Sequence, residues 1–152
     1  MKKKFWTSEK SVTLSIIVAI LLAALFVCLI FTAPPVLKWF TSLMDRRNDS
    51  YQILTVVFYA CCLPAAITLV LLMKLLFNIR AGQIFVSKNV NILRYLSWCC
   101  FVVVPITAVG SFYYFSLVVI AVAAAFIGLI LRVLKNIMAA ATEIKAENDF
   151  TV

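Results

Sequence analysis

The residues best suited to chemistry lie in one basic, polar stretch, residues 74–95, KLLFNIRAGQIFVSKNVNILRY. This stretch separates strongly apolar runs and contains no acidic residue. It carries amide, hydroxyl and guanidinium groups and an aromatic ring, which are groups that can form a site. The simpler interpretation is that these residues turn the chain, and a ligand role is the alternative. The candidate loop residues are Gly82, Phe85, Ser87, Asn89 and Arg94.

The long apolar stretches of the chain lack the residue types that catalysis within a membrane needs. Residues 11–37, 51–73 and 95–131 contain no Asp, Glu, Lys, Arg or His. A charge at the centre of a bilayer costs at least about 2.5–3.5 kcal/mol, so it is kept only where it is used. Proton-coupled transporters and intramembrane proteases need such groups. We therefore predict no enzymatic activity, no catalytic residues, no cofactor and no metal site.

The five cysteines all fall inside apolar runs, and none forms a CxxC pair. Their spacing does not match a zinc site. We interpret them as small apolar packing residues, with lipidation of Cys99 or Cys100 as the alternative.

The composition is that of a membrane protein. Of the 152 residues, 65% are hydrophobic and only 13% are charged, against about 25% charged in soluble domains. The net charge of +8 would suggest nucleic acid in a soluble protein. Here the basic residues flank apolar runs, so they indicate which segments lie on the cytoplasmic side of the membrane. We therefore predict no direct nucleic-acid binding.

The apolar runs predict an all-α fold, a four-transmembrane-helix bundle that forms a single integral membrane domain over residues 1–152. A helix of about 20 residues crosses the hydrocarbon of a bilayer. The predicted spans are residues 11–33, 52–76, 93–109 and 116–134.

The breaks between these spans are marked by turn and capping residues. Pro34-Pro35 predicts the end of the first helix, and apolar spacing over residues 36–44 predicts a short interfacial helix in the first extracytoplasmic loop. Ala81-Gly82 predicts a break after the second span. Ser87 is expected to cap a helix that starts at Lys88.

Both termini are predicted to lie in the cytoplasm. Eleven Lys and Arg residues fall on the side of the termini and of the 74–95 loop, against three on the other side. Positive residues remain on the cytoplasmic side of membrane proteins. The expected location is the inner (plasma) membrane, with multiple passes.

The fourth helix is expected to continue as an amphipathic cytoplasmic tail over residues 132–152. The tail has three possible contacts: the basic loop, the membrane surface or another protein. Its acidic tip supplies the candidate tail contacts Glu143, Glu147, Asn148 and Asp149.

Small residues recur at four-residue spacing within the fourth span. Such spacing allows close approach of two helices, either within one chain or in a homo-oligomer. The residues are Ala121, Ala124, Ala125 and Gly128.

Two segments carry a family resemblance. Residues 82–94 have Gly82, Phe85, Asn89, Leu93 and Arg94 in the order of a G-x-x-F-x-x-x-N-x-x-x-L-R pattern. The chain ends in ENDFTV, which is similar to an E-N-D-L-T-I terminus. Both resemble a family of uncharacterised bacterial four-helix integral membrane proteins, a domain of unknown function. Its members are often encoded beside a Cro/CI-type helix-turn-helix regulator, which implies a cytoplasmic DNA-binding partner.

Three functions remain open from the sequence. The first is a non-enzymatic inner-membrane protein that acts as an accessory or regulatory partner of a cytoplasmic protein. The second is a subunit of a small oligomeric channel or transporter. The third is a subunit of a membrane enzyme that lacks catalytic groups of its own.

Overall fold

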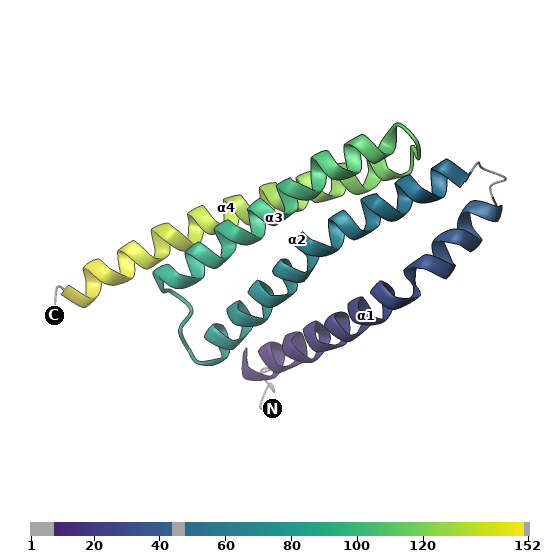
Figure 1. Ribbon diagram of the computed structural model, residues 1–152. Coiled ribbons are helices and arrows are strands. Elements are labelled where there is room, and N and C mark those ends of the chain that lie inside the picture. The colour runs from purple at the N-terminus through teal and green to yellow at the C-terminus, as the bar shows by residue number, and fades with distance from the viewer. Residues whose placement is uncertain (1–7, 44–47, 151–152) are drawn as a thin grey trace, which may run out of the picture.

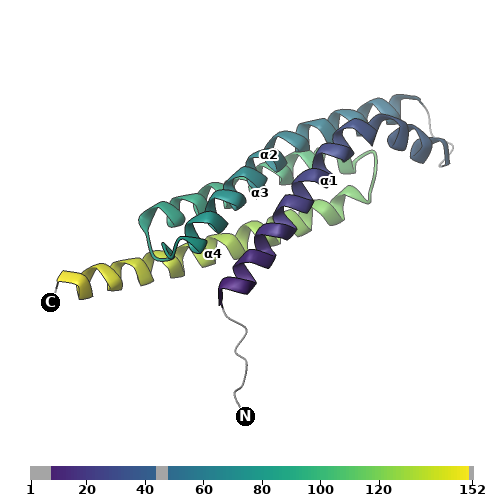
Figure 2. The same cartoon turned by 90° about the horizontal axis from the view of Figure 1, so that it is seen from below.

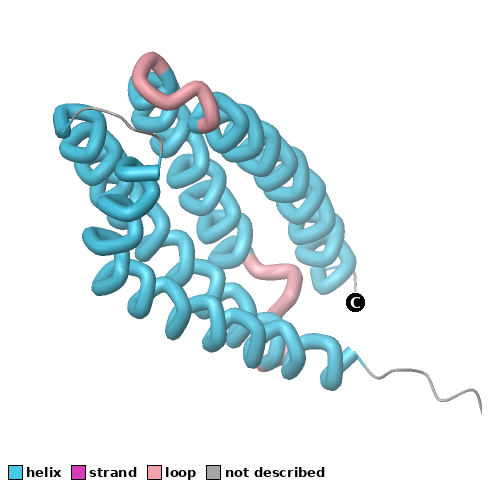
Figure 3. Tube along the Cα trace, turned by 90° about the vertical axis from the view of Figure 1, so that its right-hand side faces the viewer, coloured by secondary structure: helices cyan, strands magenta, loops and turns pink. Residues whose placement is uncertain are grey.

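The computed structural model describes the backbone of residues 8–43 and 48–150 and the side chains of residues 10–43 and 51–148. Four helices account for almost all of this part of the chain (Figure 1): α1 (Ser8–Leu43), α2 (Asn48–Arg80), α3 (Ser87–Ser111) and α4 (Leu117–Phe150). The described connections are the short loops at 81–86 and 112–116, seen in pink in Figure 3. The all-α prediction is therefore confirmed.

Each of the four helices contains a stretch long and apolar enough to cross a membrane. Helices are the expected structure there, because the hydrocarbon offers no partner to an open backbone group. Large apolar side chains on the outer faces stay exposed, such as Phe31 at 79%, Val56 at 67% and Val119 at 68%. Lipid is the solvent that suits these faces.

The helices pack in chain order, with α1 on α2, α2 on α3 and α3 on α4. The most extensive contact joins α3 and α4, which run side by side in both views (Figures 1 and 2). The core forms at the start of α3, where Ile92, Leu93 and Leu96 are buried. Side chains from α2 and α4 close around them, namely Leu71, Leu75, Leu131 and Met138.

The start of α1, the 81–86 loop and the end of α4 lie at the same end of the molecule (Figure 1). We call this the basic end, because it holds Lys74, Arg80, Lys88 and Arg94. The α4 helix continues without a break past the other helices there, as Figure 2 shows. The prediction that the fourth helix extends beyond its apolar span is confirmed.

The prediction that Pro34-Pro35 ends the first helix is wrong. Both prolines lie inside α1, which continues to Leu43, so residues 36–43 are not a separate helix. Proline at position 34 removes the amide that would donate to the carbonyl of Ile30. The hydroxyl of Tyr59 on α2 donates to that carbonyl at 3.3 Å. A neighbouring helix thus supplies the missing donor, which is how membrane helices tolerate proline.

Small residues allow close contact between α3 and α4. A Cβ added at Gly128 would lie 3.2 Å from the Cβ of Cys100. The buried hydroxyl of Ser97 donates to the carbonyl of Gly128 at 2.9 Å. Ala121 is buried as well, while Ala124 and Ala125 are half-buried. Gly128 therefore serves packing within one chain.

Candidate functional site

The 81–86 loop begins with a regular helix-ending motif. Gly82 has φ of +76°, a left-handed conformation that glycine adopts without strain. The amide of Gln83 donates to the carbonyl of Asn78, and the amide of Gly82 donates to that of Ile79, both at 3.0 Å. These two bonds define a Schellman motif, which satisfies carbonyls at the end of a helix. The predicted break at Ala81-Gly82 is confirmed.

Asn89 holds the loop against the two helices. Its side chain is fully buried, with 0% of its surface exposed. Its Nδ2 donates to the carbonyls of Gln83 at 2.6 Å and Ile84 at 2.9 Å, and its Oδ1 accepts from Nδ2 of Asn78 at 2.8 Å. A buried amide with these partners closes the loop onto the end of α2 and the start of α3. The contacts of Asn89 therefore serve chain turning.

Ser87 does not have the predicted capping role. The N-cap of α3 is Val86, in an extended conformation, and no side chain caps the helix. Ser87 is instead the first helical residue, and it is exposed. The carbonyl of Val86 accepts from the amide of Asn89 at 2.9 Å. The fold can omit the serine cap because Asn89 already anchors the segment from inside.

The other three loop candidates differ in their surroundings. Gly82 is exposed, and no atom lies within 4 Å of a Cβ built on it. Phe85 is 41% exposed at the surface of the loop. Arg94 lies two turns into α3, where it lines a small cleft with residues of α4. Of the five predicted loop residues, only Arg94 lines this cleft.

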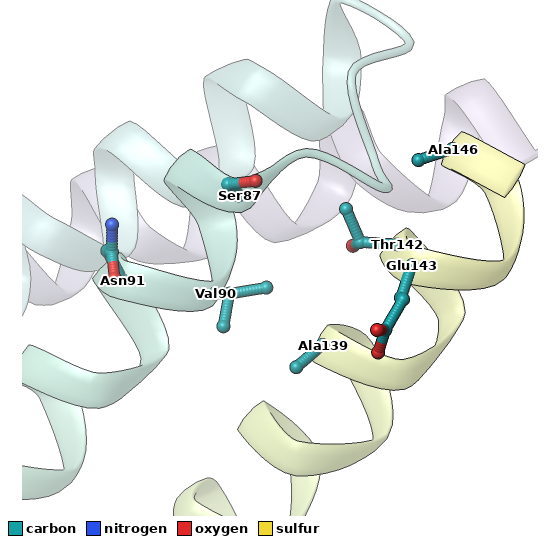
Figure 4. Close-up of a pocket in the computed structure, with 7 residues that line it drawn as sticks. All are labelled: Ser87, Val90, Asn91, Ala139, Thr142, Glu143 and Ala146. Atoms are coloured by element: carbon teal, nitrogen blue, oxygen red, sulfur yellow. The ribbon is translucent and has the colours of Figure 1, made fainter. Parts of the chain in front are cut away.

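A groove of about 280 Å³ lies between the start of α3 and the tail of α4. We call it the tail groove. Figure 4 shows Val90 on α3 and Ala139 on α4 on its facing sides, with Ser87, Asn91 and Glu143 around them. Thr142 and Ala146 complete the lining. The hydroxyl of Thr142 donates to the carbonyl of Met138 at 2.7 Å, so this hydroxyl hydrogen is already bonded within α4.

The predicted tail residues meet the loop residues only in part. Glu143 and Ser87 line the same groove. Glu147 and Asn148 are exposed further along α4, and the side chain of Asp149 lies outside the described residues. Sequence reasoning missed Asn78 and the groove residues Val90, Asn91, Ala139, Thr142 and Ala146. The polar Asn78 within an apolar helix was a usable signal, whereas the groove positions required the register of α3 against α4.

A second cavity, of about 410 Å³, lies within the apolar part of the molecule. All four helices contribute to its wall, with Leu25, Pro64, Cys100 and Ala124 among the lining residues. Its accessible lining is apolar, so it suits hydrocarbon. Within the side chains described, no group of three or more His, Cys, Asp or Glu is placed to hold a metal ion.

These features define an all-helical, multi-pass membrane protein with a mainly apolar groove at one end. The chain belongs to the family described as protein of unknown function (DUF2975), whose model matches residues 6–152. The match includes both segments that carried the resemblance. Neither the curated proteins nor the solved structures contain a match to this chain.

Proposed function

We propose that this protein is a non-enzymatic bacterial inner-membrane protein that binds a cytoplasmic protein through the tail groove. The observation that carries the proposal is the position of this groove. The uncharged stretch of α4 ends at Leu131, and the helix then continues to Phe150, about 28 Å further at 1.5 Å per residue. The groove residues of α4 all lie in that extension.

The lining of the tail groove suits a protein segment. Val90, Ala139 and Ala146 provide apolar contact, and Asn91 and Glu143 provide polar groups at the rim. Apolar contact with a few placed polar groups is typical of helix-in-groove recognition. Beside the groove, Ile144 is 60% exposed on the part of α4 that continues past the apolar span. An exposed apolar side chain there gives a partner further surface to bury.

The proposed partner class is a small DNA-binding regulator of the Cro/CI type, as the family resemblance implies. Two parts of the chain support this choice of surface. The 82–94 segment carries one part of the specific resemblance and lines the groove through Ser87. Glu143, across the groove, lies four residues before the C-terminal segment that carries the other part. Binding there would hold the regulator at the membrane and away from its operators.

The proposal requires the basic end to face the cytoplasm. The excess of Lys and Arg at that end supports this orientation. In a cysteine-free background, Ser87→Cys should react with a membrane-impermeant thiol reagent only after the cells are opened. Phe112→Cys, at the opposite end and 88% exposed, should react in intact cells. The reverse pattern would contradict the proposed orientation and, with it, a cytoplasmic partner.

Partner binding is tested by cross-linking in living cells. A photo-reactive amino acid at Ala139 or Ala146 should cross-link one protein, identified by mass spectrometry as a helix-turn-helix regulator. The same amino acid at Phe112 serves as the control and should give no such product. Ala139→Trp, which fills the groove, should abolish the cross-link from Ala146. Equal products from all three positions, or a product that survives Ala139→Trp, would rule out the tail groove as the binding surface.

A further inference from the structure

A small basic cleft on the side of α3 and α4 is independent of the proposed partner surface. Arg94, Ser97 and Trp98 of α3 and Arg132 and Lys135 of α4 line it, and its volume is about 60 Å³. Pockets for whole small molecules measure about 300–1,000 Å³. The cleft is therefore sized for a single charged group. We call it the basic cleft.

The structure holds these residues in a defined arrangement. The hydrogen bond from Ser97 to the carbonyl of Gly128 fixes the register of α3 against α4. The guanidinium carbon of Arg132 lies 5.8 Å from the ring centroid of Trp98 and 6.0 Å from that of Phe101. Contact with two aromatic rings orients the guanidinium and limits its alternative conformations. At least one of the three cations is therefore positioned before any ligand arrives.

No carboxylate is among the described residues that line the basic cleft. The sequence of α3 contains no Asp or Glu, and residues 51–80 of α2 add only the cations Lys74 and Arg80. On α4 the first carboxylate after Lys135 is Glu143, about 12 Å further along the helix axis. Three cations held together repel one another unless an anion joins them. The cleft therefore favours an anionic ligand.

The depth of the basic cleft indicates the source of that anion. Arg132 directly follows the uncharged stretch of α4, and Tyr95 directly after Arg94 begins that of α3. Trp98 is 56% exposed beside them, and tryptophan is enriched at membrane interfaces. Lipid phosphates lie at this level, and guanidinium groups bind phosphate oxygens in pairs. Basic pockets between transmembrane helices bind anionic lipid headgroups.

We infer that the basic cleft binds the phosphate of one anionic phospholipid, with Arg94, Arg132 and Lys135 as its ligands. The lipid chains then lie along the exposed apolar faces of α3 and α4. A bound lipid of this kind holds the two helices in register at the point where the tail of α4 leaves the membrane.

Lipid titration of the full chain in detergent tests this inference. Native mass spectrometry should show one phosphatidylglycerol retained per chain and no comparable retention of phosphatidylcholine. Arg94→Gln, Arg132→Gln and Lys135→Gln should each weaken retention about fivefold, the effect of one interfacial cation. Lys74→Gln is the matched control, because it removes one exposed charge at the membrane boundary of α2. At high salt the effect of Lys74→Gln should vanish, whereas the cleft, where three cations face one phosphate, keeps part of its preference.

Two further experiments separate a fitted phospholipid site from a general attraction to charge and from a site for free phosphate. Arg132→Lys keeps the charge and loses the planar fork, so retention should fall less than in Arg132→Gln. Inorganic phosphate at millimolar concentration should not displace the lipid. Loss of lipid preference in Lys74→Gln equal to that in the cleft variants, or complete displacement by inorganic phosphate, would overturn the inference. Circular dichroism of every variant identifies those that fail to fold, and Arg132→Lys supplies the test if Arg132→Gln is among them.

Discussion

The side-chain amide of Asn78 on α2 donates a 2.8 Å hydrogen bond to the Oδ1 of Asn89 on α3. This bond joins the two helices across the loop that separates them. The Nδ2 of Asn89 in turn donates to two loop carbonyls, so one buried side chain connects both helices and the loop between them. One buried asparagine therefore holds together the loop and the two helix ends at the basic end.

Replacing Asn89 should destabilise the protein strongly. In Asn89→Ala the carbonyls of Gln83 and Ile84 lose a buried donor, which should cost about 2–3 kcal/mol of unfolding free energy. Chemical unfolding in detergent micelles measures this loss. Asn91→Ala is the matched control, because Asn91 is exposed on the same helix and should change stability by less than about 0.5 kcal/mol. Equal losses in both variants would contradict the structural role of Asn89.

The turn at Gly82 should depend on backbone conformation alone. Gly82 has φ of +76°, and a Cβ there meets no atom within 4 Å. Gly82→Ala should therefore cost about 1–2 kcal/mol through left-handed strain and nothing through a clash. Gly82→Asn should cost less, because asparagine adopts this conformation more readily than alanine. Thermal unfolding of the three proteins should rank them glycine, asparagine, alanine, and equal values for alanine and asparagine would argue against a strained turn.

The hydroxyl of Tyr59 should matter only while Pro34 is present. Tyr59→Phe removes the donor to the carbonyl of Ile30 and should cost about 0.6 kcal/mol, the average for hydrogen bonds between membrane helices. In a Pro34→Ala background the restored backbone amide supplies that donor, so the second substitution should cost close to zero. A double-mutant cycle measures the difference. Additive losses would show that the two groups do not share the carbonyl.

Packing of α3 on α4 should be sensitive to volume at Gly128. A Cβ on residue 128 would lie only 3.2 Å from the Cβ of Cys100, so Gly128→Leu should cost about 1–3 kcal/mol by overpacking. Ala123→Leu makes a similar addition on an exposed position of the same helix and should be nearly neutral. Resistance to unfolding in mixed detergents compares the two. A neutral Gly128→Leu would mean that the two helices do not approach as closely as the structure shows.

The amino-acid sequence by itself determined the class of this protein. Hydrocarbon leaves no partner for an open backbone, so four apolar runs of sufficient length had to be helices. The break at Ala81-Gly82 was also readable, because left-handed backbone favours glycine whatever surrounds it. The continuation of α4 beyond Leu131 followed from its one-sided apolar pattern. Each of these features depends on neighbours in the chain and on the solvent.

The tertiary structure decided everything that depends on two helices at once. Pro34 lies inside α1, and Tyr59, on another helix, donates to the carbonyl that the proline leaves open. Asn89 is a buried connector, and Ser87 is not a cap, because the loop folds back over the start of α3. Arg94 and Arg132 line the same cleft because of the register of α3 against α4. Spacing along one helix sets which residues share its face, but the rotation and register of a neighbouring helix come from packing.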